Sequence, residues 1–135
     1  MCRHGVRPVS FSFNPHRGLI IVQVELWGAA GQGIVSLALD TGATSTLVSQ
    51  GRLLQLGYDP ASEARRLQMT TGSGVEFVPQ IPLNRIRALG LERVDFPVLG
   101  HTLPPSASVD GLLGLDFLRE HELLIDFRNG RVHLD

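Results

Sequence analysis

The chain has 135 residues, a formal net charge of -1 and 43% apolar residues, which fits one globular domain with its own core. Its 12 basic and 13 acidic residues give no excess of positive charge, so we expect no nucleic-acid partner. Cys2 is the only cysteine, which excludes an intrachain disulfide and a zinc site built on several cysteines. No apolar run approaches the ~20 residues that span a bilayer, and the first residues lack a signal-peptide pattern. We therefore expect no membrane segment and a cytoplasmic location.

Extended segments dominate the first part of the chain. Residues 19–26 and 34–39 are rich in β-branched side chains and partly alternate, which predicts a hairpin. Ser49 is a candidate N-cap for a short helix over residues 50–56, and Gly57 gives a stop signal.

Residues 65–87 predict a second, longer hairpin. Pro79 and Pro82 in its return strand cannot donate backbone hydrogen bonds, so part of that strand should be an edge or a bulge. The polar, glycine-containing tip of this hairpin consists of Thr71, Gly72, Ser73 and Gly74.

The last third of the chain predicts mostly short strands. Residues 91–99 read as a strand and residues 101–108 as a proline-rich surface loop. A short apolar strand, a helix over residues 115–121 and a final hairpin that turns at Asn129-Gly130 follow. About seven strands and two short helices indicate an all-β domain.

The most informative motif is Asp40-Thr41-Gly42-Ala43, directly after the apolar strand over residues 34–39. The strand holds the carboxylate on a rigid element, and Gly42 permits a close backbone approach. Thr41 supplies a hydroxyl that can lock neighbouring loops.

The sequence resembles the retropepsin-like aspartic proteases, including single-domain bacterial members and the protease-like domain of DNA-damage-inducible proteins. LALDTGATSTLVS is similar to the family's catalytic strand and loop, TTGSGVEFV lies where its flap hairpin belongs, and VDGLLGLDFLREHELLIDF resembles a later apolar-apolar-glycine segment that leads into a helix. The resemblance implies a retropepsin-like barrel with one or two short helices. The matching segments span residues 34–134, about three quarters of the chain. We expect a protease domain over residues 18–135, whereas residues 1–17 are an extension or strand of unknown role.

The resemblance also implies a homodimer that hydrolyses peptide bonds. Water activation needs a base while the carbonyl needs an acid, and two carboxyls about 3 Å apart share one proton and so supply both. The chain has one Asp-Thr-Gly, so Asp40 of each subunit would meet on a two-fold axis. Such a dimer could be weak and strengthen as pH falls, because association takes up a proton.

The family's other site residues are carried over by the same resemblance. Asp40, Thr41 and Gly42 form the catalytic group, and no metal or organic cofactor is implied. Either Thr71 or Gly72 could stand at the flap tip. The residues expected to bind a peptide or protein substrate are Ala43, Thr71, Gly72, Ser73, Gly74, Leu112 and Leu113.

Other constellations are weaker. The segment Asp-Gly-Leu-Leu-Gly, which starts at Asp110, partly repeats the motif. We interpret Asp110 and Asp116 as turn and helix N-terminal residues that accept hydrogen bonds from backbone N–H groups. The serines form no Gly-x-Ser-x-Gly elbow, and the five histidines lack metal-ligand spacing. The sequence thus predicts an aspartic endopeptidase. A proteolytically silent domain of the same fold, used for dimerisation or peptide binding, is the alternative.

Overall fold

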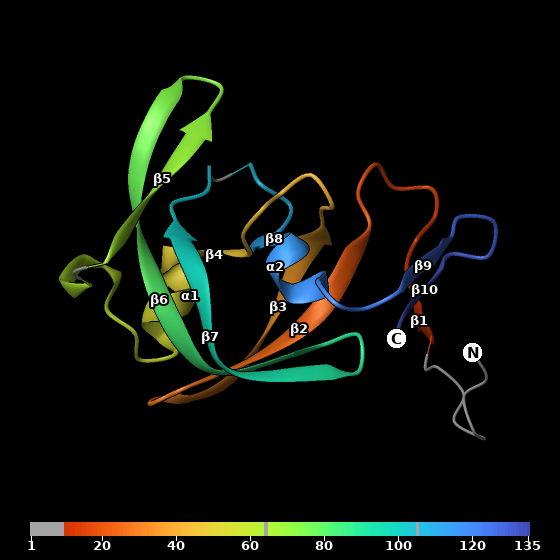
Figure 1. Cartoon of the computed structure of the whole chain (residues 1–135), viewed down its shortest axis with the longest axis horizontal. Coiled ribbons are helices and arrows are strands. Elements are labelled where there is room, and N and C mark those ends of the chain that lie inside the picture. The colour runs from red at the N-terminus through yellow and green to blue at the C-terminus, as the bar shows by residue number, and fades with distance from the viewer. Residues whose placement is uncertain (1–9, 64, 105) are drawn as a thin grey trace.

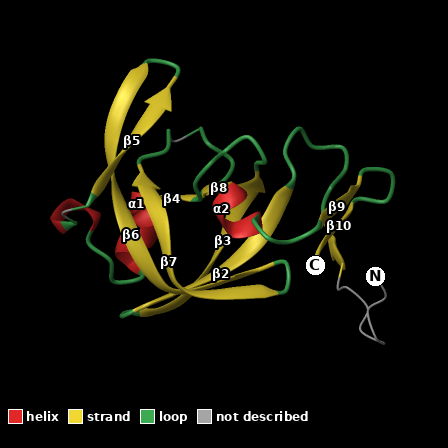
Figure 2. Cartoon of the chain, in the orientation of Figure 1, coloured by secondary structure: helices red, strands yellow, loops and turns green. Residues whose placement is uncertain are grey.

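The computed structural model describes residues 10–63, 65–104 and 106–135. Residues 1–9 of the N-terminal segment and Pro105 of the proline-rich loop therefore lie outside the described residues. Strands dominate, and the helices are short (Figures 1 and 2). The elements are β1 (Ser10–Ser12), β2 (Ile21–Gly28), β3 (Gly31–Leu39), β4 (Leu47–Ser49), α1 (Gln50–Gln55), the 3₁₀ turn η1 (Pro60–Ser62), β5 (Arg66–Thr71), β6 (Gly74–Ala88), β7 (Leu91–His101), β8 (Gly111–Leu113), α2 (Leu115–Leu118), β9 (Leu123–Asp126) and β10 (Arg131–Leu134).

Six strands close into a barrel. The order is β2, β3, β8, β4, β7 and β6, and β6 returns to β2 through Glu25, Leu26 and Trp27. The β3–β8 and β4–β7 pairs are parallel, whereas the other neighbours are antiparallel. Closure satisfies backbone groups that an open sheet would leave at its edges. The expected all-β, retropepsin-like barrel with two short helices is confirmed.

The core lies inside this barrel and follows from strand alternation. In β2, Val22, Val24 and Leu26 are buried, while Gln23 between them is exposed. Successive side chains point to opposite faces of a strand, so this pattern puts one face of β2 in the core. Helix α2 contributes Phe117, whose ring meets Phe96 edge-to-face at a centroid distance of 5.8 Å. The other large, fully buried side chains are Leu37, Leu53, Ile81, Leu83, Ile86, Leu113, Val48, Val98 and Val132.

The β5–β6 hairpin extends beyond the barrel, at the upper left of Figure 1. Thr71 pairs with Gly74 across a two-residue turn, and Gly74 has a φ of +133° that favours glycine. β6 is continuous through both prolines. At Pro82 it has the free edge that the sequence predicted, because β2 joins that side only from Arg85 onward.

A separate three-stranded sheet joins the two ends of the described chain. Its order is β1, β10, β9, and Phe11 in β1 pairs with Val132 in β10. β1 belongs to residues 1–17, to which the sequence assigned no role. β9 and β10 form the predicted final hairpin, with Asn129 and Gly130 in its turn.

The two helices begin where the sequence predicts them and end earlier. The Ser49 hydroxyl accepts the Arg52 N–H at 3.3 Å and caps α1, as expected. Helix α2 stops at Leu118 rather than at residue 121. Arg119 is extended and Glu120 has a φ of +69°, so the chain turns there toward β9.

Tyr58 joins the end of the first hairpin to β6. Its hydroxyl donates to the Trp27 carbonyl and accepts the Asn84 N–H at 2.8 Å, and burial raises the pKa of this hydroxyl against the opposing effect of the Asn84 hydrogen bond. We expect Tyr58→Phe to lower the free energy of unfolding by about 1–2 kcal/mol, because two backbone groups lose their partner. Urea unfolding measures this change, and an unchanged midpoint would contradict the assigned hydrogen bonds.

Candidate active site

Asp40 lies at the end of barrel strand β3. Leu39, just before it, pairs in parallel with Leu113 of β8. The Asp40 N–H donates to the Leu113 carbonyl at 3.0 Å and so continues this pairing by one residue. Asp40 itself is only half-buried. A rigid strand thus presents an accessible carboxylate.

The loop after Asp40 folds back on the carboxylate. The Gly42 N–H donates to Oδ1 of Asp40 at 2.9 Å, and the Ala43 N–H donates to the Asp40 carbonyl at 3.2 Å. A Cβ atom at residue 42 would lie 3.2 Å from the same Oδ1, which explains a small residue there. Thr41 and Gly42 are exposed to solvent. One backbone donor therefore orients the carboxylate and leaves it acceptor positions.

The apolar-apolar-glycine segment lies beneath this loop. A Cβ atom at Gly114 would lie 2.8 Å from the Ala43 and Ser45 carbonyl oxygens, so only glycine permits this approach. Leu113 is 0% exposed and belongs to the core. Leu112 is half-buried, so part of its side chain is accessible to solvent. Of the two leucines, only Leu112 is placed to meet a ligand.

A cleft of about 500 Å³ opens beside Asp40. The Asp40 loop and Leu112 form its base, and β5 of the long hairpin forms its opposite wall. It also contains Gly42 and Ala43, two of the residues singled out from the sequence. Another hollow of about 510 Å³ lies between β1 and β2, away from Asp40. The remaining lining residues of the Asp40 cleft are Thr44, Ser45, Leu47, Gln68, Met69, Thr70 and Leu99.

Three residues of the hairpin tip, Gly72, Ser73 and Gly74, are not among the residues that line this cleft. Gly72, Ser73 and Gly74 are exposed at the turn, and of Thr71 only the backbone is described. The wall consists instead of the strand residues just before the tip, Gln68 to Thr70. The sequence motifs did not single out these residues. Their position in a strand predicted beside the tip was the signal that could have found them.

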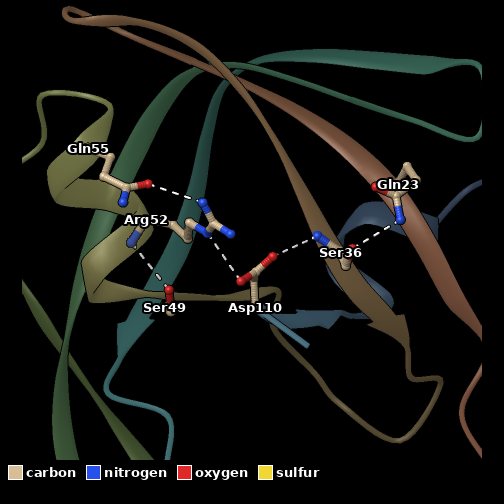
Figure 3. A network of polar contacts seen from close by, with 6 residues as sticks. All are labelled: Gln23, Ser36, Ser49, Arg52, Gln55 and Asp110. Carbon is tan, nitrogen blue, oxygen red and sulfur yellow. Dashed lines mark hydrogen bonds and ion pairs between the residues drawn. The ribbon is translucent and has the colours of Figure 1, made fainter. Parts of the chain in front are cut away.

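The carboxylate of Asp110 is engaged away from the cleft. It accepts the Ser36 N–H at 2.9 Å and the Arg52 Nε–H at 3.2 Å, which joins β3, α1 and the start of β8 (Figure 3). The Gln23 amide and the Gln55 side chain extend the network at its two ends. Asp110 thus accepts a backbone N–H, as the sequence predicted. This N–H belongs to Ser36 in a strand rather than to a helix.

Asp116 is likewise a structural carboxylate. It stands in the first turn of α2 and accepts the Phe117 N–H at 2.9 Å, as the helix prediction requires. It also accepts the Thr46 N–H, which the sequence did not indicate.

Within the described residues, His, Cys, Asp and Glu side chains form no group of three or more that could hold a metal ion. The same part of the chain contains no helix long and apolar enough to cross a membrane.

The barrel, the Asp-Thr-Gly loop and the supporting glycine segment define an aspartic-protease fold. The model of the family described as gag-polyprotein putative aspartyl protease matches residues 29–120, and the chain belongs to this family. The structure is similar to the crystal structure of a retropepsin-like aspartic protease from Rickettsia conorii, with a TM-score of 0.69 and 19% sequence identity over 95% of this chain and 90% of that chain. A search of curated protein sequences gives no match.

Proposed function

We propose that the protein is an aspartic endopeptidase, active as a homodimer in which Asp40 of each subunit meets its counterpart. The observation that carries this proposal is an accessible Asp40 at the end of a barrel strand, at the base of a 500 Å³ cleft walled by a hairpin. Membership of an aspartyl protease family supports it.

The chemistry requires two carboxyls. The ionised carboxylate takes a proton from water, whose oxygen attacks the peptide carbonyl carbon while the protonated partner donates its proton to the carbonyl oxygen. Collapse of the tetrahedral intermediate breaks the C–N bond, and the amine leaves with a proton from the pair. Asp110 and Asp116, the two other aspartates considered in the sequence, are engaged in structural contacts. The second carboxyl is therefore assigned to the partner's Asp40.

The other site residues take supporting roles in this proposal. Thr41 is exposed beside Asp40 and is assigned to hydrogen-bond the partner's loop. The β5–β6 hairpin serves as a flap that covers an extended peptide and excludes water. Half-buried Ala43, Met69 and Leu112 offer apolar surface to substrate side chains. The cleft thus favours an apolar residue beside the cleaved bond.

The test is hydrolysis of a mixed peptide library at about pH 4 to 7, with the mass of the protein measured by light scattering in the same buffers. We expect internal cleavage by a dimer, with apolar residues enriched at the cleaved bonds. A well-folded dimer that binds peptides and cleaves none would contradict the proposal and favour a proteolytically silent peptide-binding domain.

Dimer affinity should depend on pH. Two Asp40 carboxylates brought together repel each other until the pair takes up one proton, so a lower pH favours association. We expect the dimer dissociation constant to be lower at about pH 5 than at about pH 8 in sedimentation equilibrium. The Asp40→Asn variant has no such charge, so its dissociation constant should differ much less between the two pH values. Equal pH dependence in both proteins would contradict paired Asp40 carboxylates.

A further inference from the structure

We propose that the contact between Thr46 and Asp116 positions the Asp40 loop, so that Asp116 is a positioning residue for peptide hydrolysis although it touches no substrate. The inference rests on the proposed function. It adds a residue 70 positions away from Thr46 in the sequence whose part in the reaction the motif itself does not indicate.

Thr46 is unusual in its surroundings. Among the described residues it is the only polar or charged one that is fully buried, at 0% exposure. Its hydroxyl donates to Oδ1 of Asp116 at 2.7 Å and accepts the Gly114 N–H at 3.1 Å. Its backbone N–H donates to both carboxylate oxygens of Asp116 at 3.0 Å. Asp116 is half-buried, and hydrogen bonds to a charged acceptor are among the stronger ones in proteins.

Residues next to these contacts form hydrogen bonds with the Asp40 loop. Next to Gly114, the Leu113 carbonyl accepts the Asp40 N–H at 3.0 Å. Two further backbone hydrogen bonds run in the opposite direction, from the Leu115 N–H to the Ala43 carbonyl at 2.8 Å and from the Asp116 N–H to the Thr44 carbonyl at 3.2 Å. Residues 113–116 thus hold the loop at Asp40, at Ala43 and Thr44, and at Thr46.

Part of the same loop is exposed to solvent. Thr41, Gly42 and Thr44 are exposed, and the cleft lies on one side of the loop. Asp116 does not line this cleft. Its effect on the reaction must therefore pass through Thr46 and the loop backbone. Loss of the contact should let the loop shift while the barrel strands, which have their own pairing, stay in place.

A shifted loop changes the geometry of the paired carboxyls. A displacement of about 1 Å in a catalytic group can cost about 10²-fold in rate. Two neighbouring carboxyls share one proton only within a certain pH range. This pH range becomes narrower when the two carboxyls move apart. The expected signature is therefore a lower kcat with a nearly unchanged KM, together with a narrower pH–rate profile. A general loss of stability would reduce the amount of folded enzyme without narrowing the profile.

The experiment compares four variants, and a fifth as a control, with the wild-type dimer. We expect Asp116→Ala and Thr46→Val to lower kcat by roughly 10- to 100-fold, to change KM by less than about twofold and to narrow the profile. Asp116→Asn and Thr46→Ser keep an acceptor and a hydroxyl, so they should restore most of kcat and of the profile width. Asp110→Ala is the matched control, because it removes a carboxylate that braces β3 and α1 rather than the loop. It should lower the midpoint of unfolding and keep the kcat of the folded dimer.

Amide hydrogen exchange tests the same inference without activity. In Thr46→Val, the amides of Asp40, Ala43 and Leu115 should exchange faster, whereas the Ser36 amide should keep its wild-type rate. Unchanged exchange at the loop amides, or a wild-type pH profile and kcat in folded Asp116→Ala, would overturn the inference. A wild-type protein without peptidase activity would instead refute the proposed function, and the exchange rates would still decide whether Asp116 positions the loop.

Discussion

Asp40→Asn should abolish peptide hydrolysis and leave the fold intact. Removal of the group that holds and transfers the proton should lower kcat by about 10³-fold or more. The amide oxygen of asparagine can still accept the Gly42 N–H that now donates to Oδ1 at 2.9 Å, so the loop keeps its conformation. Rates of cleavage of a single fluorogenic peptide, measured at equal dimer concentration, provide the comparison.

The matched control for this substitution is Asp110→Asn. It makes the same chemical change in the partial repeat of the motif, where the carboxylate accepts from Ser36 and Arg52 rather than facing the cleft. We expect a small loss of stability and a kcat within about threefold of wild type, because exposed structural pairs contribute little. Full activity of Asp40→Asn, or equal loss in both variants, would refute the assignment of Asp40.

Gly111→Ala should have the largest effect on stability. Gly111 begins β8 between β3 and β4, and a Cβ atom there would overlap the Leu47 carbonyl oxygen of β4. The obstacle is backbone within the barrel, so neither strand can move aside without loss of pairing. We expect the free energy of unfolding to fall by about 3 kcal/mol, measured by urea unfolding.

Gly51→Ala is the control with the opposite sign. Gly51 is exposed in α1, and a Cβ atom at this position would meet nothing within 4 Å. Alanine loses less backbone entropy than glycine on folding, so we expect a gain of roughly 0.5 kcal/mol. Equal shifts of the unfolding midpoint in the two variants would contradict the tight packing of β8 against β4.

Strand and hairpin positions could be predicted where the pattern is local. Residues 19–26 and 34–39 alternate well enough to predict β2 and β3, and Ser49 marks the start of α1 correctly. The three-residue strand β4 was missed, and β1 lies in the segment that the sequence left open as an extension or strand. So short a segment has no measurable period and exists only through pairing with distant strands.

The candidate site, too, could be predicted from the sequence only where the pattern is local. Asp40 and its loop could be found because a short motif follows a strand directly. The cleft wall at Gln68, Met69 and Thr70 depends on how the long hairpin folds over the barrel, which no local pattern encodes. The burial of Leu113 and the contact of Thr46 with Asp116 likewise depend on the packing of segments about 70 residues apart.

The central claim is that one site requires Asp40 from two subunits, and subunit mixing tests it most directly. Wild-type and Asp40→Asn chains are mixed in equal amounts at a fixed total concentration, under conditions where dimers exchange subunits. If both carboxyls are needed, only about one quarter of the dimers can act, so activity should fall to about one quarter of that of wild type alone. An activity of about one half would mean that each subunit works by itself, and would contradict the shared site.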